Sequence, residues 1–248
     1  MVNVALKIVL APVLVVQAVA TRKRAPSLPE AEGAREGCVG AGNGGRGGAF
    51  RLLIAGDSSA AGVGVARQDQ ALSGYLSRAL QRLLARPVQW SLHAKSGFTT
   101  QQVFQLLREQ KLPAADVAVV VTGVNDVIEQ VSLRRVLAQR AAMADWLLAE
   151  HGVAHVVFAP LPPVEHFPLL PSPLRNVMGA DAHRHDTAVA RWAATRSDVS
   201  HAVIDVELGP ESMAADGFHP GEPVYRTCGE ALAAHISNLP LAATEKHA

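Results

Sequence analysis

The stretch RLLIAGDSS at residues 51–59 decides the fold. Its first five residues form a short apolar run that ends at Gly56, a pattern typical of a buried β-strand. Residues 71–85 follow with leucines at a helical spacing, which predicts a helix soon after this strand. A strand followed by a helix is the repeating element of α/β proteins, so the rest of the chain can be searched for the same alternation.

That alternation continues to the end of the chain. Four more apolar runs predict strands over residues 88–93, 116–122, 153–159 and 201–206. Helices are expected to begin at Thr99 or Thr100, at Ser132, near Leu174 and near Pro223. Five strands interleaved with helices predict an α/β fold with a five-stranded parallel sheet covered on both faces.

The residues before Phe50 do not follow this alternation of strands and helices. Residues 1–20 are largely apolar and end in Ala18-Val19-Ala20, which resembles a signal-peptide cleavage site, but the basic residues 22–24 follow directly. Such basic residues tend to hold the following chain in the cytoplasm. Three interpretations stay open: a cleaved signal peptide, a membrane anchor, or an apolar helix docked on the domain. We expect an exported or membrane-anchored protein, with membrane association through this segment.

Residues 21–49 are rich in glycine and proline, a composition that predicts a flexible linker. The folded domain is therefore expected over residues 50–240, with a short tail over 241–248.

The composition of the chain argues against several classes of function. The net charge of +1 gives no electrostatic case for binding nucleic acid. Cys38 and Cys228 lie in no spacing typical of a zinc or redox motif. Residues 181–186 contain Asp and His, but His183 and His185 point to different faces of a helix, so we interpret them as solvated surface. We expect neither a metal nor a cofactor.

In a parallel sheet, ligands bind beyond the carboxyl ends of the strands. Polar or glycine-rich segments follow the predicted strands at residues 56–64, 95–99, 123–126 and 216–220. The fold is expected to gather these four segments at one edge of the sheet.

Together these segments contain what acyl transfer requires. Ser58 is a candidate nucleophile, and His219 is a candidate base whose imidazole Asp216, three residues earlier, can orient. The oxyanion of the tetrahedral intermediate needs aligned donors. Candidates are the backbone N–H groups of Gly97 and Ser58 and the side-chain amide of Asn125.

The four segments also resemble the conserved blocks of the SGNH/GDSL hydrolase family over about residues 50–240. The matching residues are Gly56-Asp57-Ser58-Ser59, Gly97, Gly123-Val124-Asn125-Asp126 and Asp216-Gly217-Phe218-His219-Pro220. The first block reads G-D-S-S instead of G-D-S-L, and the second matches only at Gly97 and the threonines that follow.

This resemblance implies a flavodoxin-like, three-layer α/β/α fold and a serine esterase or lipase-like enzyme that needs no metal. It also implies Ser58 as nucleophile, Asp216 and His219 as the rest of the triad, and Gly97 and Asn125 in the oxyanion hole.

We therefore expect a serine hydrolase that cleaves carboxylic esters of small molecules or lipids through an acyl-enzyme. One alternative is an acyltransferase or thioesterase that uses the same residues. Two others are a catalytically idle binding module on the same fold and a nucleotide-binding flavodoxin-like protein. The sequence leaves open the acyl chain length, the leaving group and the oligomeric state.

Overall fold

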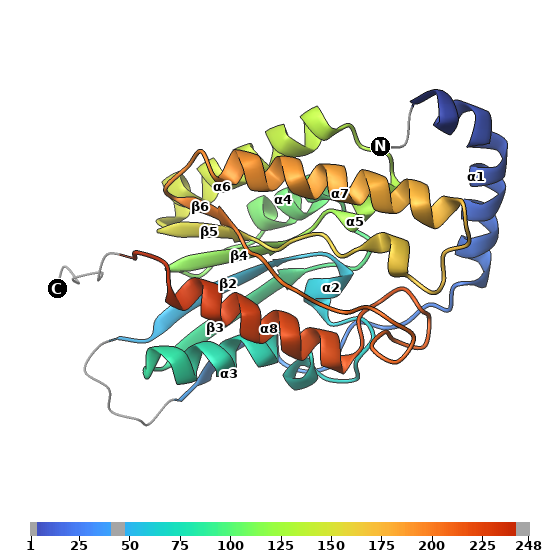
Figure 1. Cartoon of the computed structure of the whole chain (residues 1–248). Helices are drawn as coiled ribbons and strands as arrows, with labels where there is room; N and C mark the ends of the chain where they lie inside the picture. Colours follow the sequence, from blue (N-terminus) through green and yellow to red (C-terminus); the bar gives the residue numbers. More distant parts are fainter. Residues whose placement is uncertain (1–3, 41–47, 242–248) are drawn as a thin grey trace.

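A computed structural model of the chain describes residues 4–40 and 48–241 (Figure 1). Its centre is a six-stranded sheet in the order β1-β3-β2-β4-β5-β6. All neighbouring strands are parallel except β1 and β3. The strands are β1 (Glu36–Val39), β2 (Phe50–Gly56), β3 (Val88–Ala94), β4 (Val117–Val121), β5 (His155–Phe158) and β6 (Val199–His201).

Helices cover both faces of the sheet, so the predicted three-layer α/β/α fold is confirmed (Figure 1). The helix pair α3 and α8 covers one face, and α4, α6 and α7 cover the other. The α-helices are α1 (Val4–Arg24), α2 (Ser58–Ala61), α3 (Leu72–Leu84), α4 (Thr100–Glu109), α5 (Val124–Ile128), α6 (Leu133–His151), α7 (Leu174–Ala193) and α8 (Glu222–Ser237), with 3₁₀ turns η1 (Gln68–Gln70) and η2 (Val164–His166).

Strand β2 lies between β3 and β4 and is buried on both sides. Leu52 and Ile54 pack toward the layer of α3 and α8, whereas Leu53 and Ala55 pack toward the layer of α4, α6 and α7. A strand covered on both faces needs an apolar residue at every position, which is why RLLIA carries no alternation of polar and apolar residues.

The predicted linker over residues 21–49 is wrong in part. Residues 21–24 close α1, and residues 36–39 form β1, which pairs antiparallel with β3 at the edge of the sheet. The pairing uses backbone hydrogen bonds, so it does not require the run of apolar side chains that predicts a buried strand. The glycine-rich residues 41–47 and most of the expected tail, residues 242–248, lie outside the described part of the chain.

The last strand also differs from the prediction. The run at residues 201–206 was expected to pair, but β6 ends at His201 and the chain continues as an extended segment. Val203 in this segment is exposed, whereas Ile204 and Val206 face a cavity. This segment therefore has the alternation typical of a strand, but it lines the cavity instead of pairing with the sheet.

Helix α1 packs on α7. Lys7 pairs with Asp181, and Gln17 donates to the carbonyl of Ser172 (2.8 Å) and accepts from the backbone N–H of Leu174 (3.1 Å). These are the contacts that a helix docked on the domain requires, which is one of the three interpretations of this segment. Among the residues that the structure describes, no helix is both long and apolar enough to cross a membrane.

The surface assigned to residues 181–186 needs correction. Asp181 and His185 are buried, because α1 and α5 both pack on α7. His183 is exposed, as the helical spacing predicted.

The layer of α3 and α8 gives a direct test of the core. Leu80→Ala removes a fully buried side chain and should lower the free energy of unfolding by about 2–5 kcal/mol. Leu83→Ala is the matched control on the same helix, because Leu83 is 54% exposed and its loss should cost well under about 1 kcal/mol. Denaturant unfolding of both variants measures the difference, and equal losses would contradict the packing of α3.

Candidate active site

Ser58 lies at the point where β2 turns into α2. Asp57 caps this short helix through a hydrogen bond from the Ser59 N–H to its Oδ1 (3.0 Å). The Asp57 N–H donates to the carbonyl of Val121 on β4 (3.0 Å), which fixes the turn against the neighbouring strand. Gly56 permits this approach, because a Cβ there would lie 2.3 Å from the same carbonyl oxygen. The sharp turn places Ser58 at the carboxyl edge of the sheet, where parallel sheets bind ligands.

His219 and Asp216 form a tethered pair in the loop before α8. Asp216 Oδ2 lies 2.5 Å from His219 Nδ1, and Asp216 Oδ1 accepts the backbone N–H groups of Phe218 and His219, both at 2.9 Å. Burial opposes ionisation of Asp216, but the hydrogen bonds from His219 and Phe218 outweigh it and lower the pKa of the carboxyl. An ionised Asp216 holds the proton on Nδ1, which leaves His219 Nε2 free to accept a proton.

Ser58 and His219 line the same cavity of about 260 Å³. They reach it from segments that are 161 residues apart in the chain but meet at one end of the sheet, beside α2 in Figure 1. Within the described residues the two side chains share no hydrogen bond. Catalytic hydrogen bonds are often long in unliganded enzymes and shorten when substrate binds, so the shared cavity is the relevant observation.

Asn125 joins the three loops that follow β2, β3 and β4. Its Nδ2 donates to the carbonyl of Phe98 (3.0 Å) and, in a longer contact, to Asp57 Oδ2 (3.4 Å). The side chain also lines the cavity that holds Ser58 and His219. The structure therefore brings Ser58, Asn125 and His219 together, with Asp216 behind the histidine.

Gly97 lies farther out. It is exposed in the turn after β3, with a φ of +81° that favours glycine, and it is not among the residues that line the cavity. Its neighbour Phe98 supplies the carbonyl that holds Asn125. An oxyanion role for Gly97 stays a prediction.

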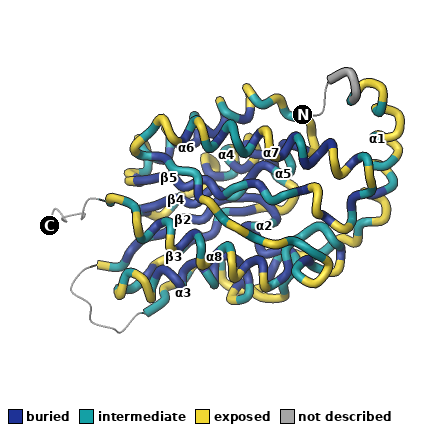
Figure 2. The backbone as a smooth tube through the Cα atoms, in the orientation of Figure 1, coloured by how far each residue is buried: buried dark blue, intermediate teal, exposed yellow. Residues whose placement is uncertain are grey.

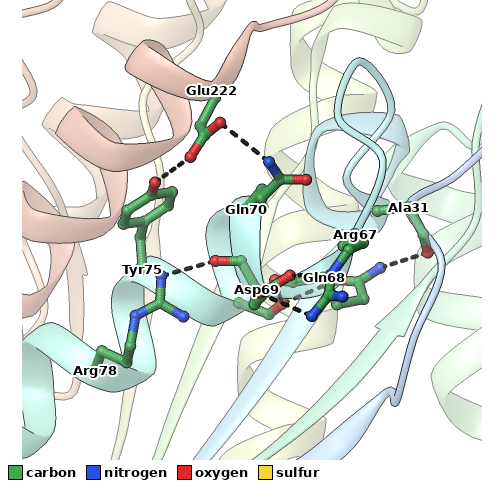
Figure 3. Close-up of polar contacts among 9 residues, drawn as sticks. Ala31, Arg67, Gln68, Asp69, Gln70, Tyr75, Arg78 and Glu222 are labelled. Atoms are coloured by element: carbon green, nitrogen blue, oxygen red, sulfur yellow. Dashed lines mark hydrogen bonds and ion pairs between the residues drawn. The ribbon is translucent and has the colours of Figure 1, made fainter.

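Helix α3 and the 3₁₀ turn before it tie the two halves of the site together (Figure 3). Buried Gln68 donates from Nε2 to the carbonyls of Ala31 (3.1 Å) and Ala61 (2.9 Å), so it holds the end of α2. Glu222, in the first turn of α8, accepts a hydrogen bond from the Tyr75 hydroxyl (2.5 Å). The loop that carries His219 and the helix that carries Ser58 are thus fixed to the same structural unit.

Sequence reasoning missed a buried group of charges under the site. Arg140 on α6 is fully buried and donates from Nη2 to the carbonyl of Thr122 (2.6 Å). Asp126 is also fully buried and accepts from the N–H (3.1 Å) and the hydroxyl (2.5 Å) of Thr100. Arg140 is close enough to Asp57 for its positive charge to favour the ionised form of that carboxyl, and the negative charge of Asp126 acts on Arg140 in turn. Only the place of Arg140 on the inner face of an amphipathic helix pointed to its burial.

Asp57 is the group whose protonation this environment changes most clearly. Burial raises the pKa of its carboxyl to about 7, against the hydrogen bond from the Ser59 N–H. The negative charge of Asp126 raises the pKa further, and Arg140 opposes it. Asp57 therefore changes its charge in the folded protein close to neutral pH.

This shift predicts a pH-dependent stability. In the unfolded chain Asp57 ionises near pH 4, so between about pH 4 and 7 the unfolded state binds fewer protons and stability falls as pH rises. Asp57→Asn removes this dependence. The unfolding free energy of the variant relative to wild type should rise by roughly 4 kcal/mol from pH 4 to pH 8. A difference that stays constant across this range would show that the pKa of Asp57 is not raised; a constant offset from the altered cap does not affect the test.

Comparisons with known proteins identify the family of this chain. Residues 54–227 match the GDSL-like Lipase/Acylhydrolase family. The chain is 31% identical over 210 residues to a GDSL-like esterase of Mycobacterium tuberculosis, an alignment that covers 79% of this chain and 63% of that protein. The chain thus spans less than two thirds of the length of this relative. The protein belongs to the GDSL-like lipase/acylhydrolase family.

Solved structures show the same fold at low sequence identity. A lipase from a goat rumen metagenome matches with a TM-score of 0.61 and 19% identity, covering 78% of this chain and all of that one (100%). An inhibitor-bound aryl esterase of Mycobacterium smegmatis matches with a TM-score of 0.58 and 19% identity, covering 77% of this chain and 100% of that one. At such identities the likeness establishes the fold alone.

Proposed function

We propose that the protein is a serine hydrolase that cleaves carboxylic esters, with Ser58 as nucleophile and the Asp216–His219 pair as its base. The observation that carries the proposal is that Ser58 and a histidine tethered to a buried carboxylate line one cavity. A serine hydroxyl is a weak nucleophile and needs such a base within reach. Membership of the GDSL-like family supports the same chemistry.

In the proposed reaction His219 Nε2 takes the proton of Ser58 Oγ as that oxygen attacks the ester carbonyl. The tetrahedral intermediate collapses, the carbon–oxygen bond to the alcohol breaks, and His219 returns the proton to the leaving alcohol. His219 then takes a proton from a water molecule while the oxygen of that water attacks the acyl-enzyme. The acid is released and Ser58 is regenerated. Asp216 remains ionised throughout and stabilises the imidazolium.

We propose two donors for the oxyanion, the backbone N–H of Ser58 and the side-chain amide of Asn125. The N–H of Ser58 lies in the first turn of α2, where backbone N–H groups have no intrahelical partner. Asn125 holds the carbonyl of Phe98 with one amide hydrogen, and its second points toward Asp57 in a contact of 3.4 Å. Such a long contact is weak, so this hydrogen can be redirected to the oxyanion at little cost. Losing a donor of this kind typically slows catalysis by about 10²–10³-fold.

The cavity favours an apolar group on the substrate. Its walls beyond Ser58 are mainly aliphatic and aromatic, including Leu161, Phe167, Ile204 and Met213. Each methylene that such walls remove from water contributes about 0.8 kcal/mol. A volume of about 260 Å³ lies near the lower end of small-molecule pockets, which supports a small or medium-sized ester.

Two adjacent serines provide the test of this proposal. Ser58→Ala removes the nucleophile and should lower kcat/KM for a chromogenic acyl ester by about 10⁴-fold or more. Ser59→Ala is the matched control: Ser59 also lines the cavity, and the backbone N–H that Asp57 accepts is unchanged, so less than about tenfold should be lost. Equal activity in wild type and Ser58→Ala would exclude Ser58 as the nucleophile.

The same assay with esters of increasing acyl length examines the cavity. We expect kcat/KM to rise by up to about fourfold for each added methylene until the cavity is filled. A rate that is independent of acyl length would show that the cavity does not bind the acyl group.

A further inference from the structure

Helix α1 turns an apolar face to solvent. Its most exposed large apolar residues are Ile8 (69%), Val9 (74%) and Val16 (68%). Figure 2 shows that exposed residues recur along α1. From Lys7 onward, where the structure describes exposure, the exposed large hydrophobic residues of α1 are Ile8, Val9, Val13, Val15, Val16 and Val19. Single exposed valines are common on proteins, but a contiguous apolar face of this size marks an interaction surface.

The opposite face of α1 holds the contacts to the rest of the protein, which combine polar side chains with half-buried apolar ones such as Leu14. Lys7 pairs with Asp181, Gln17 binds Ser172 and Leu174, and Thr21 is buried. An ordinary surface helix turns a polar face to solvent, whereas the outer face of α1 is apolar. The inner face is occupied by α7, so the apolar outer face is the side left for a partner.

The charge of α1 indicates the kind of partner. The helix ends in Arg22, Lys23 and Arg24, all exposed, and its sequence contains no acidic residue. A parallel pairing of two copies along this helix would bring the basic residues 22–24 together, whereas a surface of anionic lipid headgroups complements their charge. Apolar side chains beside a basic cluster are the combination with which helices bind a membrane interface.

The position of α1 connects this face to the cavity. In Figure 1 the helix runs across the end of the molecule where α2 lies. Leu14, on its inner side, packs against a cluster that contains Phe167 and Met213, and both of these line the cavity. The docking side of α1 is therefore continuous with the cavity wall.

We propose that the exposed face of α1 binds a membrane surface that contains anionic lipid, with the helix lying in the plane of the interface while it stays docked on α7. Ile8, Val9, Val15 and Val16 enter the acyl region, and the residues 22–24 contact the headgroups. The binding does not depend on the chemistry at Ser58, so it can be tested apart from catalysis.

Flotation of the full chain with vesicles tests the proposal. The wild type should float with vesicles of phosphatidylcholine and phosphatidylglycerol, and less with phosphatidylcholine alone or at high salt. Val9→Glu combined with Val16→Glu places two charges on one side of α1 and should weaken partitioning at least about tenfold. Replacing Arg22, Lys23 and Arg24 by glutamine should remove most of the preference for the anionic vesicles.

Leu83→Glu is the matched control, since it introduces the same charge at an exposed apolar residue of α3 and should leave flotation unchanged. Circular dichroism establishes that each variant is folded. A folded wild type that does not float with anionic vesicles, or a Val9→Glu/Val16→Glu variant that floats as well as wild type, would overturn the proposal. So would a wild type that stays off vesicles while the same variant abolishes a dimer seen by sedimentation, because the apolar face would then bind a second copy.

Discussion

At the end of β2, the backbone of Gly56 lies so close to β4 that a Cβ would stand 2.3 Å from the carbonyl oxygen of Val121. This approach lets the chain turn sharply after the strand, so that Asp57 binds β4 through its N–H and caps α2 through its carboxyl. Ser58 is then the first residue of the helix, at the carboxyl edge of the sheet. Any larger residue at position 56 would separate β2 from β4 and move the serine away from the cavity it shares with His219.

The rest of the site depends on the same edge. Asn125 follows β4 and binds the loops after β2 and β3, and the loop that carries His219 is held by the start of α8. Beneath them lie Arg140 and Asp126, charged groups that are costly to bury. Asp126 accepts from Thr100 and Arg140 donates from Nη2 to Thr122, whereas Nε and Nη1 of Arg140 have no hydrogen-bond partner among the described residues. Burial raises the pKa of Asp57, directly beside the proposed nucleophile, to about 7; Asp126 adds to this shift and Arg140 opposes it.

The sequence predicted four of the parallel strands and the covering helices, because apolar runs and helical spacing are local signals, but it placed the last strand at residues 201–206 instead of Val199–His201. It also predicted which segments would meet at one edge, since the direction of parallel strands fixes that. It did not predict β1, because an edge strand such as Glu36–Val39 is held by backbone pairing and not by an apolar pattern. Nor did it predict the burial of Arg140 or of Asp181, which depends on tertiary partners far away in the chain. Side-chain periodicity in the sequence therefore predicts the layers of the fold, whereas the burial of a polar group depends on how those layers pack together.

We propose that Ser58 is the reactive serine because the fold places it in the same cavity as the tethered His219. Labelling with an alkyl fluorophosphonate tests it most directly, because the serine oxygen displaces fluoride at phosphorus while the histidine takes the serine proton. After digestion, peptide mass spectrometry should place the label on Ser58 in the wild type, and His219→Ala should react far more slowly. A label on Ser59 or on another serine, or a rate that does not depend on His219, would contradict the account.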